Sequence, residues 1–329
     1  MSTSQPHEVV WSVATAMLAA RSLQTVAELA IADRIADEPV SAARLAEDRN
    51  VDGDALDRVL HLLSSHGIFQ RSGDGWAHND ASRVLRADHP MSLRPFVRMM
   101  GMPMIWGSVT GLSDSVLTGA PSPGTIGPGG AWDYLQANAH QATIFGEAMT
   151  AKAGADIGAV LAAYDFTRFA IIADIGGGRG HLLHAVLNSS PTSNGILFDL
   201  PAVIDVLPPQ HDRCTAHAGD FFTDPLPTAD AYVMMEVIHD WPDDRSLAIL
   251  TAARAAAAPG ATLLVIESLI TEEQPDPRAR ILDIIMLTVT GGRERTSSQL
   301  DELLRRTGWQ QQQVIDTAGP MRILEATAM

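Results

Sequence analysis

The sequence predicts an α/β protein in which a mostly α-helical N-terminal part precedes a parallel β-sheet with crossover helices. From Val9 onward, apolar residues recur at helical spacing. From Phe169 onward, short apolar strands alternate with helical stretches, the pattern of a parallel sheet. A glycine loop, Asp174 to Gly180, directly follows the first of these strands. Such a loop lets backbone N–H groups at a helix start approach a ligand.

Length and charge limit both the organisation and the partners. A chain of 329 residues exceeds the usual 100 to 200 per domain, and we divide it into residues 1–95, 96–160 and 161–329. Apolar residues make up 46% and charged residues 19%, which is typical of a globular protein. The formal charge of −16 disfavours nucleic acid and anionic membranes, since both bind through Lys and Arg.

The single cysteine, Cys214, allows neither an internal disulfide nor a cysteine zinc site and fits a reducing, cytoplasmic location. The apolar run from Val9 to Ala20 lacks a basic leader and stops at Arg21, so we expect a helix and no signal peptide. No uncharged apolar run reaches about 18 residues, so no membrane span is expected.

The first 80 residues carry the outline of a winged helix. Ser41 is a candidate N-cap for a helix over 42–47, and a second helix is expected over 52–64. The segments 68–70 and 76–78 flank a glycine-containing turn and predict a small β-hairpin.

A winged helix often reads DNA, so the charge of its candidate recognition helix matters. That helix carries Asp52, Asp54 and Asp57 against Arg58. This balance opposes phosphate binding and favours dimerisation or a scaffold role. A ligand-sensing DNA-binding regulator stays as an alternative from another class.

Between residues 91 and 155 the chain is rich in methionine, glycine and proline. Residues 120–130 contain three prolines and four glycines and predict a flexible connection, after which a helix runs through Phe145 and Met149. Methionine clusters fill irregular cores, and they also suit flat apolar ligands, so both interpretations stay open.

In the C-terminal part five strands and four helices are expected. The strands are at residues 169–174, 195–199, 214–218, 231–235 and 262–267, and the helices at 180–188, 202–207, 244–258 and 296–307.

Several side chains after these strands suit a nucleoside ligand. His181 stands where a dinucleotide fingerprint needs a small residue, which counts against NAD. Asp199 ends the second strand near the offset at which a carboxylate grips ribose hydroxyls. Asp220 and Phe221 follow the third strand and offer an acceptor and an aromatic face to adenine, although Gly219 and Asp220 also read as a simple turn.

His239 follows the fourth strand. Ligands of an open parallel sheet lie at the carboxyl ends of its strands, which places His239 beside the bound molecule. A lone histidine is usually structural, but this position favours a chemical role.

Five motifs in order resemble the S-adenosylmethionine-dependent O-methyltransferases of the caffeate and hydroxyindole type and their relatives in bacterial secondary metabolism. The motifs are residues 174–180, 198–201, 219–222, 238–241 and 291–296. The resemblance covers nearly the whole chain. It implies a Rossmann-like class I methyltransferase domain preceded by a mostly α-helical winged-helix dimerisation domain, and hence a homodimer.

The resemblance also implies roles for individual residues. His239 would be the general base, flanked by the carboxylates of Glu267 and Glu294, with Glu267 alone also readable as a cap or a surface charge. The expected cofactor is S-adenosylmethionine, released as S-adenosylhomocysteine. Many relatives have a basic residue shortly before the histidine, where this chain has Met235 and Glu236. The cofactor-binding candidates are Asp174, Gly176, Gly178, Asp199, Leu200, Asp220, Phe221 and Met235.

We expect no metal. Methyl transfer from a sulfonium is an in-line displacement from an activated leaving group, so positioning supplies much of the catalysis. His181, His184 and His239 form no ligand-spaced cluster, and Asp243 with Asp244 is expected to begin a helix.

The predicted function is methylation of a hydroxyl, a phenolic one above all, on an aromatic or polyketide-like small molecule. An alternative within the fold is a relative that uses S-adenosylmethionine without transferring its methyl group. The candidate residues of an apolar substrate pocket are Met99, Met102, Trp106, Phe145, Met149, Asp240, Met286 and Val289.

Overall fold

The computed structural model describes residues 5–47, 50–122, 126–127, 129–271 and 276–329. The chain divides into two compact units. The helical unit comprises Met1–Met102 and Thr143–Ala151, and the sheet unit comprises Pro103–Ala142 and Lys152–Met329. The predicted flexible connection over 120–130 lies partly outside the described residues.

The helical unit contains the predicted winged-helix elements. Its elements are α1 (Pro6–Glu28), a 3-10 turn (Ala32–Arg34), α2 (Ala42–Ala46), α3 (Gly53–Ser65), β1 (Gln70–Ser72), β2 (Gly75–Ala77), α4 (Asp80–Arg83) and α5 (Arg94–Met100). Ser41 caps α2 by accepting from the backbone N–H of Arg44 at 3.3 Å, as expected. The hairpin is tighter than predicted, because β1 and β2 pair up to Ser72 and Gly75 and leave a two-residue turn.

The helical unit has its own core, in which the side chains of Leu60, Phe69 and Trp76 are fully buried. Asp57, on the face of α3 considered for DNA, accepts a hydrogen bond from the indole Nε1 of Trp76 at 2.7 Å. That carboxylate is therefore part of the packing between α3 and the hairpin.

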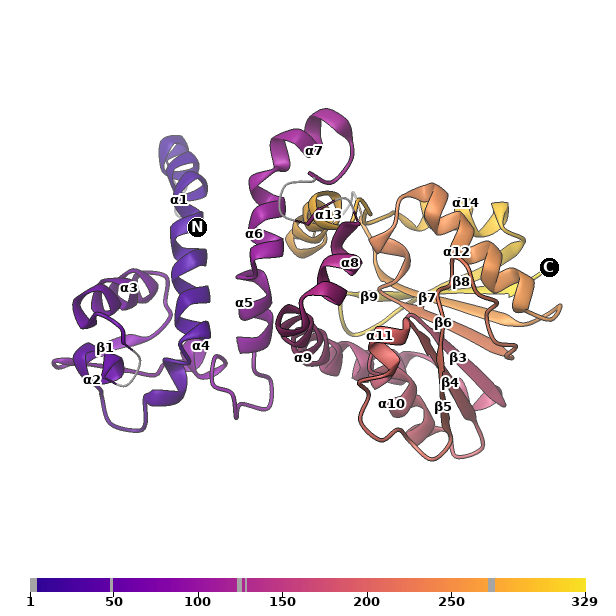
Figure 1. The fold of residues 1–329 in the computed structure, drawn as a ribbon, viewed down its shortest axis with the longest axis horizontal. Coiled ribbons are helices and arrows are strands. Elements are labelled where there is room, and N and C mark those ends of the chain that lie inside the picture. The colour runs from indigo at the N-terminus through magenta and orange to yellow at the C-terminus, as the bar shows by residue number, and fades with distance from the viewer. Residues whose placement is uncertain (1–4, 48–49, 123–125, 128, 272–275) are drawn as a thin grey trace. The chain divides into compact units, whose positions relative to one another are not determined.

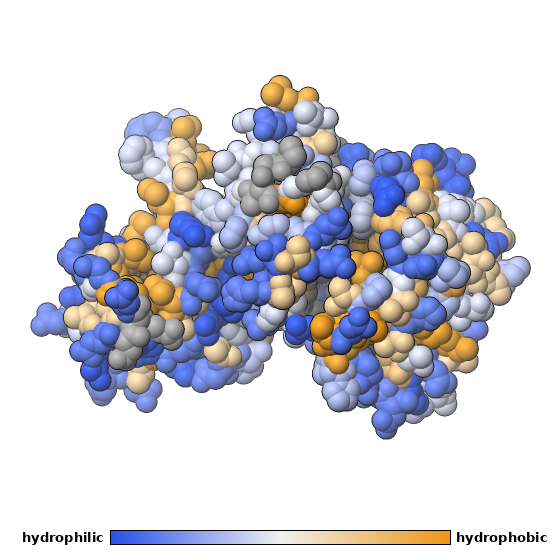
Figure 2. Space-filling view, viewed as in Figure 1, coloured by the Kyte–Doolittle hydropathy of each residue, from blue (hydrophilic) through white to orange (hydrophobic). Residues whose placement is uncertain are grey.

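Helix α1 presents apolar side chains to solvent. Val10, Trp11 and Val13 are each at least 70% exposed, and Figure 2 shows apolar colouring along this helix. By length and composition α1 is also long and apolar enough to cross a membrane, with 11% of its most apolar window buried. The expectation of no membrane span concerned uncharged runs of about 18 residues, and α1 contains none, because Arg21 interrupts it. One such helix near the N-terminus is a weak indication of a span.

The sheet unit is a seven-stranded sheet with helices on both faces (Figure 1). Its strand order is β5-β4-β3-β6-β7-β9-β8, with parallel pairing from β5 to β7 and antiparallel pairing of β9 with both neighbours. The strands are β3 (Ile171–Ile175), β4 (Asn194–Asp199), β5 (Cys214–Ala218), β6 (Ala231–Met235), β7 (Thr262–Ser268), β8 (Trp309–Asp316) and β9 (Met321–Ala328). The chain reverses its direction of travel through the sheet between β3 and β6, and a crevice forms at such a switch point.

Alternating apolar residues bury both faces of the sheet. Residues such as Tyr232 and Met234 point into a core shared with α12 (Asp243–Ala256) and α14 (Ser297–Arg306). Their neighbour Val233 points to the opposite core, shared with α9 (Ala139–Ala163) and α10 (His181–Ser189). The remaining helical elements are α6 (Pro103–Thr110), α7 (Leu112–Thr118), α8 (Gly130–Ala137), α11 (Pro201–Ile204) and α13 (Pro277–Val289), with 3-10 turns at Phe166–Arg168 and Ile238–Asp240.

Candidate active site

The glycine loop after β3 adopts backbone conformations that require glycine. Gly176 and Gly178 have φ values of +69° and +58°, and no atom lies within 4 Å of the place where a Cβ on Gly178 would stand. Asp199, at the end of β4, accepts a hydrogen bond from the backbone N–H of Gly178 at 2.7 Å and one from Leu200 at 2.7 Å. The loop is thus held open from the neighbouring strand. Arg179 within it is exposed.

Asp174 lies beneath this loop and is buried. A Cβ on Gly177 would stand 2.5 Å from the Cγ of Asp174, so the carboxylate packs directly against the loop backbone. Its Oδ2 has no hydrogen-bond partner among the described residues. Burial, aided by the charge of Asp199, raises the pKa of Asp174 to about 7. An unpartnered buried acceptor at this place fits a cationic or hydrogen-bond-donating ligand.

Asp220 and Phe221 follow β5 next to the glycine loop. The ring of Phe221 lies 3.8 Å from the place where a Cβ on Gly176 would stand. Asp220 accepts a hydrogen bond from the backbone N–H of Phe222 at 2.8 Å, which is a turn contact. Both interpretations of Asp220 therefore stay compatible with its position. Met235, half-buried, ends β6 on the other side of β3.

His239 lies in the 3-10 turn that follows β6, and a buried carboxylate fixes one of its ring nitrogens. Nδ1 of His239 is 2.7 Å from Oε1 of Glu294, although the two residues are 55 positions apart. The side chain of Glu294 is fully buried, and that of His239 is 9% exposed. Because an ionised carboxylate can only accept, Nδ1 carries a proton, and in the neutral ring Nε2 carries the lone pair. This is the arrangement of an oriented general base.

Glu267 approaches the same histidine from the end of β7. Its Oε1 accepts from the backbone N–H of Ile238 at 2.9 Å and of His239 at 3.3 Å. Its Oε2 is 3.7 Å from Nδ1 of His239. Glu267 therefore holds the backbone of the turn, whereas Glu294 holds the ring. The fold brings His239, Glu267 and Glu294 together, as the sequence analysis expected.

The charges around His239 shift the pKa values of the cluster. Burial by itself lowers the pKa of His239, but the three surrounding carboxylates, Glu267 first, outweigh burial and raise the pKa to about 10. Burial raises the pKa of Glu267 to about 7 and that of Asp240, whose Oδ1 is 3.8 Å from Nε2 of His239, to about 6. The carboxylates therefore stabilise the imidazolium that forms when Nε2 accepts a proton.

A cation that the sequence analysis did not identify lies beside this cluster. Lys152, on α9, pairs with Glu236, which follows Met235 and has a φ of +54°. Burial raises the pKa of Glu236, but Lys152 and then His239 outweigh it and lower the pKa overall. Positions 235 and 236 carry no basic residue, but Lys152 of α9, 84 residues earlier in the sequence, places a positive charge beside Glu236.

The expectation that nothing resembles a metal site overlooked one cluster. Ligand atoms of His239, Glu267 and Glu294 all lie within 4.8 Å of one another. The cluster cannot be recognised from sequence spacing, because its three residues belong to separate parts of the chain. The 2.7 Å separation of Nδ1 and Oε1 is a hydrogen-bond distance, whereas two ligand atoms of a tetrahedral zinc ion stand roughly 3.3 Å apart. We therefore assign the contact as a hydrogen bond.

The predicted pocket residues fall in both units. Met99, Met102, Phe145 and Met149 belong to the helical unit, and Trp106, Asp240, Met286 and Val289 to the sheet unit. Within the sheet unit α6 packs against α13, which carries Met286 and Val289, and both of these residues are buried. A chamber that uses both sets stays a prediction.

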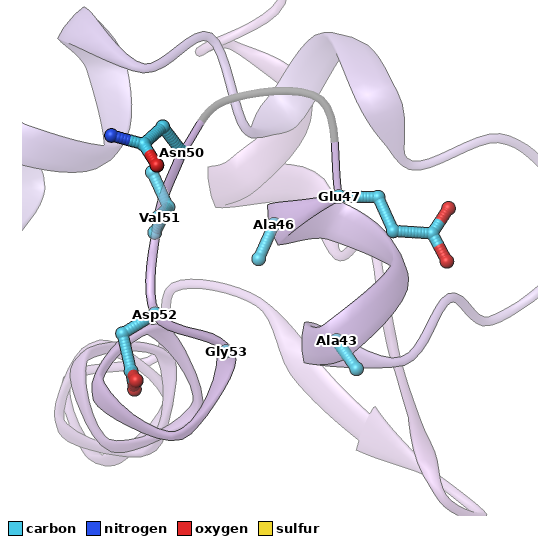
Figure 3. A pocket seen from close by; sticks show the side chains of 7 residues that line it. All are labelled: Ala43, Ala46, Glu47, Asn50, Val51, Asp52 and Gly53. Atoms are coloured by element: carbon cyan, nitrogen blue, oxygen red, sulfur yellow. The ribbon is translucent and has the colours of Figure 1, made fainter.

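A hollow in the helical unit lies away from this chemistry. It has a volume of about 610 Å³ and is lined by α2, the start of α3 and the segment between them (Figure 3). Glu47 and Asp52 are its charged residues, and Asp52 is already used as the cap of α3. Nothing at this hollow matches the chemistry of the cluster around His239.

Known proteins resemble the chain in both sequence and structure. The family model of the O-methyltransferase domain matches residues 110–310 of the sequence. The family model of the O-methyltransferase dimerisation domain matches residues 11–88. The mitomycin biosynthesis 6-O-methyltransferase of Streptomyces lavendulae is 34% identical over 93% of this chain and 90% of its own. The phenazine O-methyltransferase of Lysobacter antibioticus is 32% identical over 93% and 92%.

Among solved structures, an O-methyltransferase from neocarzinostatin biosynthesis, in complex with S-adenosylmethionine and 2-hydroxy-5-methyl naphthoic acid, has a TM-score of 0.81. It is 30% identical and covers 95% of this chain and 96% of its own. With a domain match over more than half of its length and such relatives over nearly all of it, the chain belongs to the O-methyltransferase family.

Proposed function

We propose that the chain methylates a phenolic hydroxyl of an aromatic or polyketide-like small molecule, with S-adenosylmethionine as the methyl donor and His239 as the general base. The observation that carries this proposal is the 2.7 Å contact between Nδ1 of His239 and Glu294, at the strand ends beside the glycine loop. A histidine held in this way keeps Nε2 ready to accept a proton. Because His239, Glu267 and Glu294 are all present, we disfavour the alternative in which the protein uses S-adenosylmethionine without transferring its methyl group.

The residues after β3, β4 and β5 fit S-adenosylmethionine. Gly178 leaves open space for a ligand, and the unpartnered Oδ2 of Asp174 suits its cationic groups. In this proposal Asp199 would bind the ribose, and Asp220 and Phe221 would bind the adenine. Gly176, Leu200 and Met235 complete the cofactor-binding set. When bound, the cofactor supplies a methyl group on a sulfonium and departs as S-adenosylhomocysteine.

The protein's own part in the reaction is proton transfer and positioning. In the neutral ring, Nε2 of His239 would take the proton from the substrate hydroxyl. Glu294 accepts the hydrogen bond from Nδ1 and stabilises the positive ring that forms. Glu267 keeps the turn in place through two backbone N–H groups. The imidazolium then loses its proton to solvent.

The raised pKa of His239 favours a phenol as the acceptor. The surrounding carboxylates raise the pKa of His239, which makes the neutral ring a stronger base. A phenol is a far stronger acid than an aliphatic alcohol, so a histidine base removes its proton at lower cost. The relatives from mitomycin and phenazine pathways bear names that fit aromatic acceptors.

We further propose a homodimer formed through α1. The exposed apolar side chains Trp11, Val13 and Met17 need a covering surface, and a second copy supplies one. The match to a dimerisation domain over residues 11–88 supports this assignment. We also propose that turnover needs no metal and that the protein binds neither nucleic acid nor a membrane.

Incubation with labelled S-adenosylmethionine and a panel of acceptors tests the proposed reaction. The panel comprises phenols, hydroxynaphthoates and phenazine phenols, with aliphatic alcohols and aromatic amines of matched size as controls. We expect transfer of label to a phenolic oxygen. Transfer of the label to the amines alone would contradict the assignment. Formation of S-adenosylhomocysteine without a methylated acceptor would contradict it as well.

A further inference from the structure

We propose that Arg295 is a positioning residue for the reaction, because it locks the turn that carries His239 onto the segment that carries Glu294. Arg295 is 3% exposed and lies beside Glu294 in residues 291–296, which we call the clamp segment. Since the base must be His239 for this role to matter, the inference rests on the proposed function.

The guanidinium reaches the backbone on both sides of His239. Nη1 donates to the carbonyl of Ile238 at 3.0 Å, and Nη2 donates to the carbonyl of Trp241 at 2.8 Å. The carbonyl of His239 itself accepts from the backbone N–H of Arg293 at 2.8 Å. Three carbonyls of the catalytic turn are therefore bound by donors of the clamp segment.

A second set of contacts fixes the guanidinium itself. Asp243, the first residue of α12, accepts from Nε at 3.0 Å and from Nη2 at 2.8 Å through one oxygen. Ser246, one turn later, accepts from Nη2 at 3.2 Å. A planar guanidinium can hold these directions at once, whereas the ammonium of lysine offers a single donating centre.

Gly292 shows how closely the clamp segment lies on the turn. A Cβ at this position would stand 2.0 Å from the carbonyl oxygen of His239. Any shift of the segment therefore moves the backbone of His239 as well as Glu294. One segment thus sets the place of the base and, through Glu294, the direction of its ring. A displacement of about 1 Å in such an arrangement can cost about 100-fold in rate.

The role predicts a specific pattern in Arg295→Met and Arg295→Lys. We expect kcat to fall by about 10- to 100-fold in Arg295→Met and by less in Arg295→Lys. The Kd for S-adenosylmethionine, measured by calorimetry, should stay within about threefold of wild type. The rising limb of kcat against pH should move to lower pH, because a displaced Glu294 no longer supports the imidazolium.

A matched arginine separates this role from general stabilisation. Arg254, on α12, also donates to three backbone carbonyls, those of Ala257, Gly308 and Met329, away from the catalytic turn. Arg254→Met should lower the unfolding temperature yet leave kcat per folded molecule and the pH limb unchanged. If Arg295→Met does not fold, Arg295→Lys and Asp243→Asn carry the same test, with falls of a few fold.

Two results would overturn the inference. The first is that Arg295→Lys and Asp243→Asn both keep the wild-type kcat and the wild-type pH dependence of kcat. This result would remove the role of Arg295 and leave the proposed function intact. The other is wild-type turnover in His239→Gln, which removes both the proposed function and the role of Arg295.

Discussion

Glu294 accepts a hydrogen bond from Nδ1 of His239 at 2.7 Å, and the fold supplies this contact across 55 residues. The carboxylate follows α13, whereas the histidine follows β6. The backbone N–H of Glu294 donates a hydrogen bond to the carboxylate of Asp283 at 2.9 Å. The contact decides which ring nitrogen is free to act as a base, and the predictions below follow from it and from its surroundings.

Replacement of Glu294 by glutamine should weaken and shift the activity. The amide carries no charge, so the pKa of His239, now raised to about 10, should fall toward its ordinary value of 6.5. The base form then appears at lower pH, and the rising limb of kcat/KM moves to lower pH. The plateau should drop by about 100-fold, because the imidazolium loses its carboxylate.

Steady-state kinetics from pH 6 to 10 measure both effects. Glu302→Gln, on the exposed part of α14, removes a carboxylate that pairs with Arg305 and serves as the control. If kcat/KM of Glu294→Gln rises over the same pH range as that of the wild type, the titrating group is not His239.

Asp174→Asn should stabilise the ligand-free protein while weakening cofactor binding. A carboxyl whose folded-state pKa is raised to about 7 costs stability increasingly as pH rises from 3.8 to 7, and fully above that range. The amide removes this cost, so we expect an unfolding temperature about 2 to 4 °C higher at pH 8, with a smaller gain at pH 5. The Kd for S-adenosylmethionine should rise about 10-fold or more.

Thermal melts at both pH values and calorimetry provide the measurements. Asp212→Asn replaces an exposed aspartate and should change neither property. Unchanged affinity in Asp174→Asn would exclude Asp174 from the cofactor site.

Charged residues on α1 should dissociate the proposed dimer. Val13 and Met17 are 73% and 59% exposed and lie one helical turn apart, so the double change Val13→Asp, Met17→Asp places two charges in the proposed interface. Sedimentation at micromolar concentration should show a dimer for wild type and a monomer for the variant. Val206→Asp, at an equally exposed apolar residue on the sheet unit, should stay dimeric. A wild-type monomer under these conditions is incompatible with the proposal.

Chelation should leave turnover unchanged. The ligand atoms of His239, Glu267 and Glu294 lie close enough to bind a metal, but His239 and Glu294 are already joined by a hydrogen bond. Dialysis against EDTA should therefore retain full activity, and added Zn²⁺ should inhibit by competing for His239. Loss of activity on chelation, restored by one metal, would instead identify a metal enzyme.

Local patterns predicted much of the sheet. The bounds of β5 and β6 were predicted without error, and those of β7 within one residue, because their apolar runs are bounded by turn residues. β8 and β9 were missed: β8 contains four consecutive glutamines at an edge, and β9 lies between two antiparallel neighbours. α13 was also missed as an element, although two of its residues were named as pocket candidates. The helix expected over the apolar run from Val9 to Ala20 is part of α1, which extends from Pro6 to Glu28 and is followed by a 3-10 turn.

The site was predictable where residues follow strand ends and unpredictable where contacts join distant segments. His239 and Asp199 could be placed from the strand order alone. Nothing local indicates that Lys152 pairs with Glu236, or that Arg295 binds the carbonyls on either side of His239. Those contacts depend on how α9 and the clamp segment pack against the sheet.

The most direct test of the central claim is the turnover of His239→Gln, measured together with its affinity for S-adenosylmethionine. Glutamine keeps a polar side chain but cannot accept a proton at neutral pH. We expect the Kd for the cofactor to stay near wild type and kcat for a phenolic acceptor to fall by about 100-fold or more. Wild-type turnover in this variant would show that His239 is not the base.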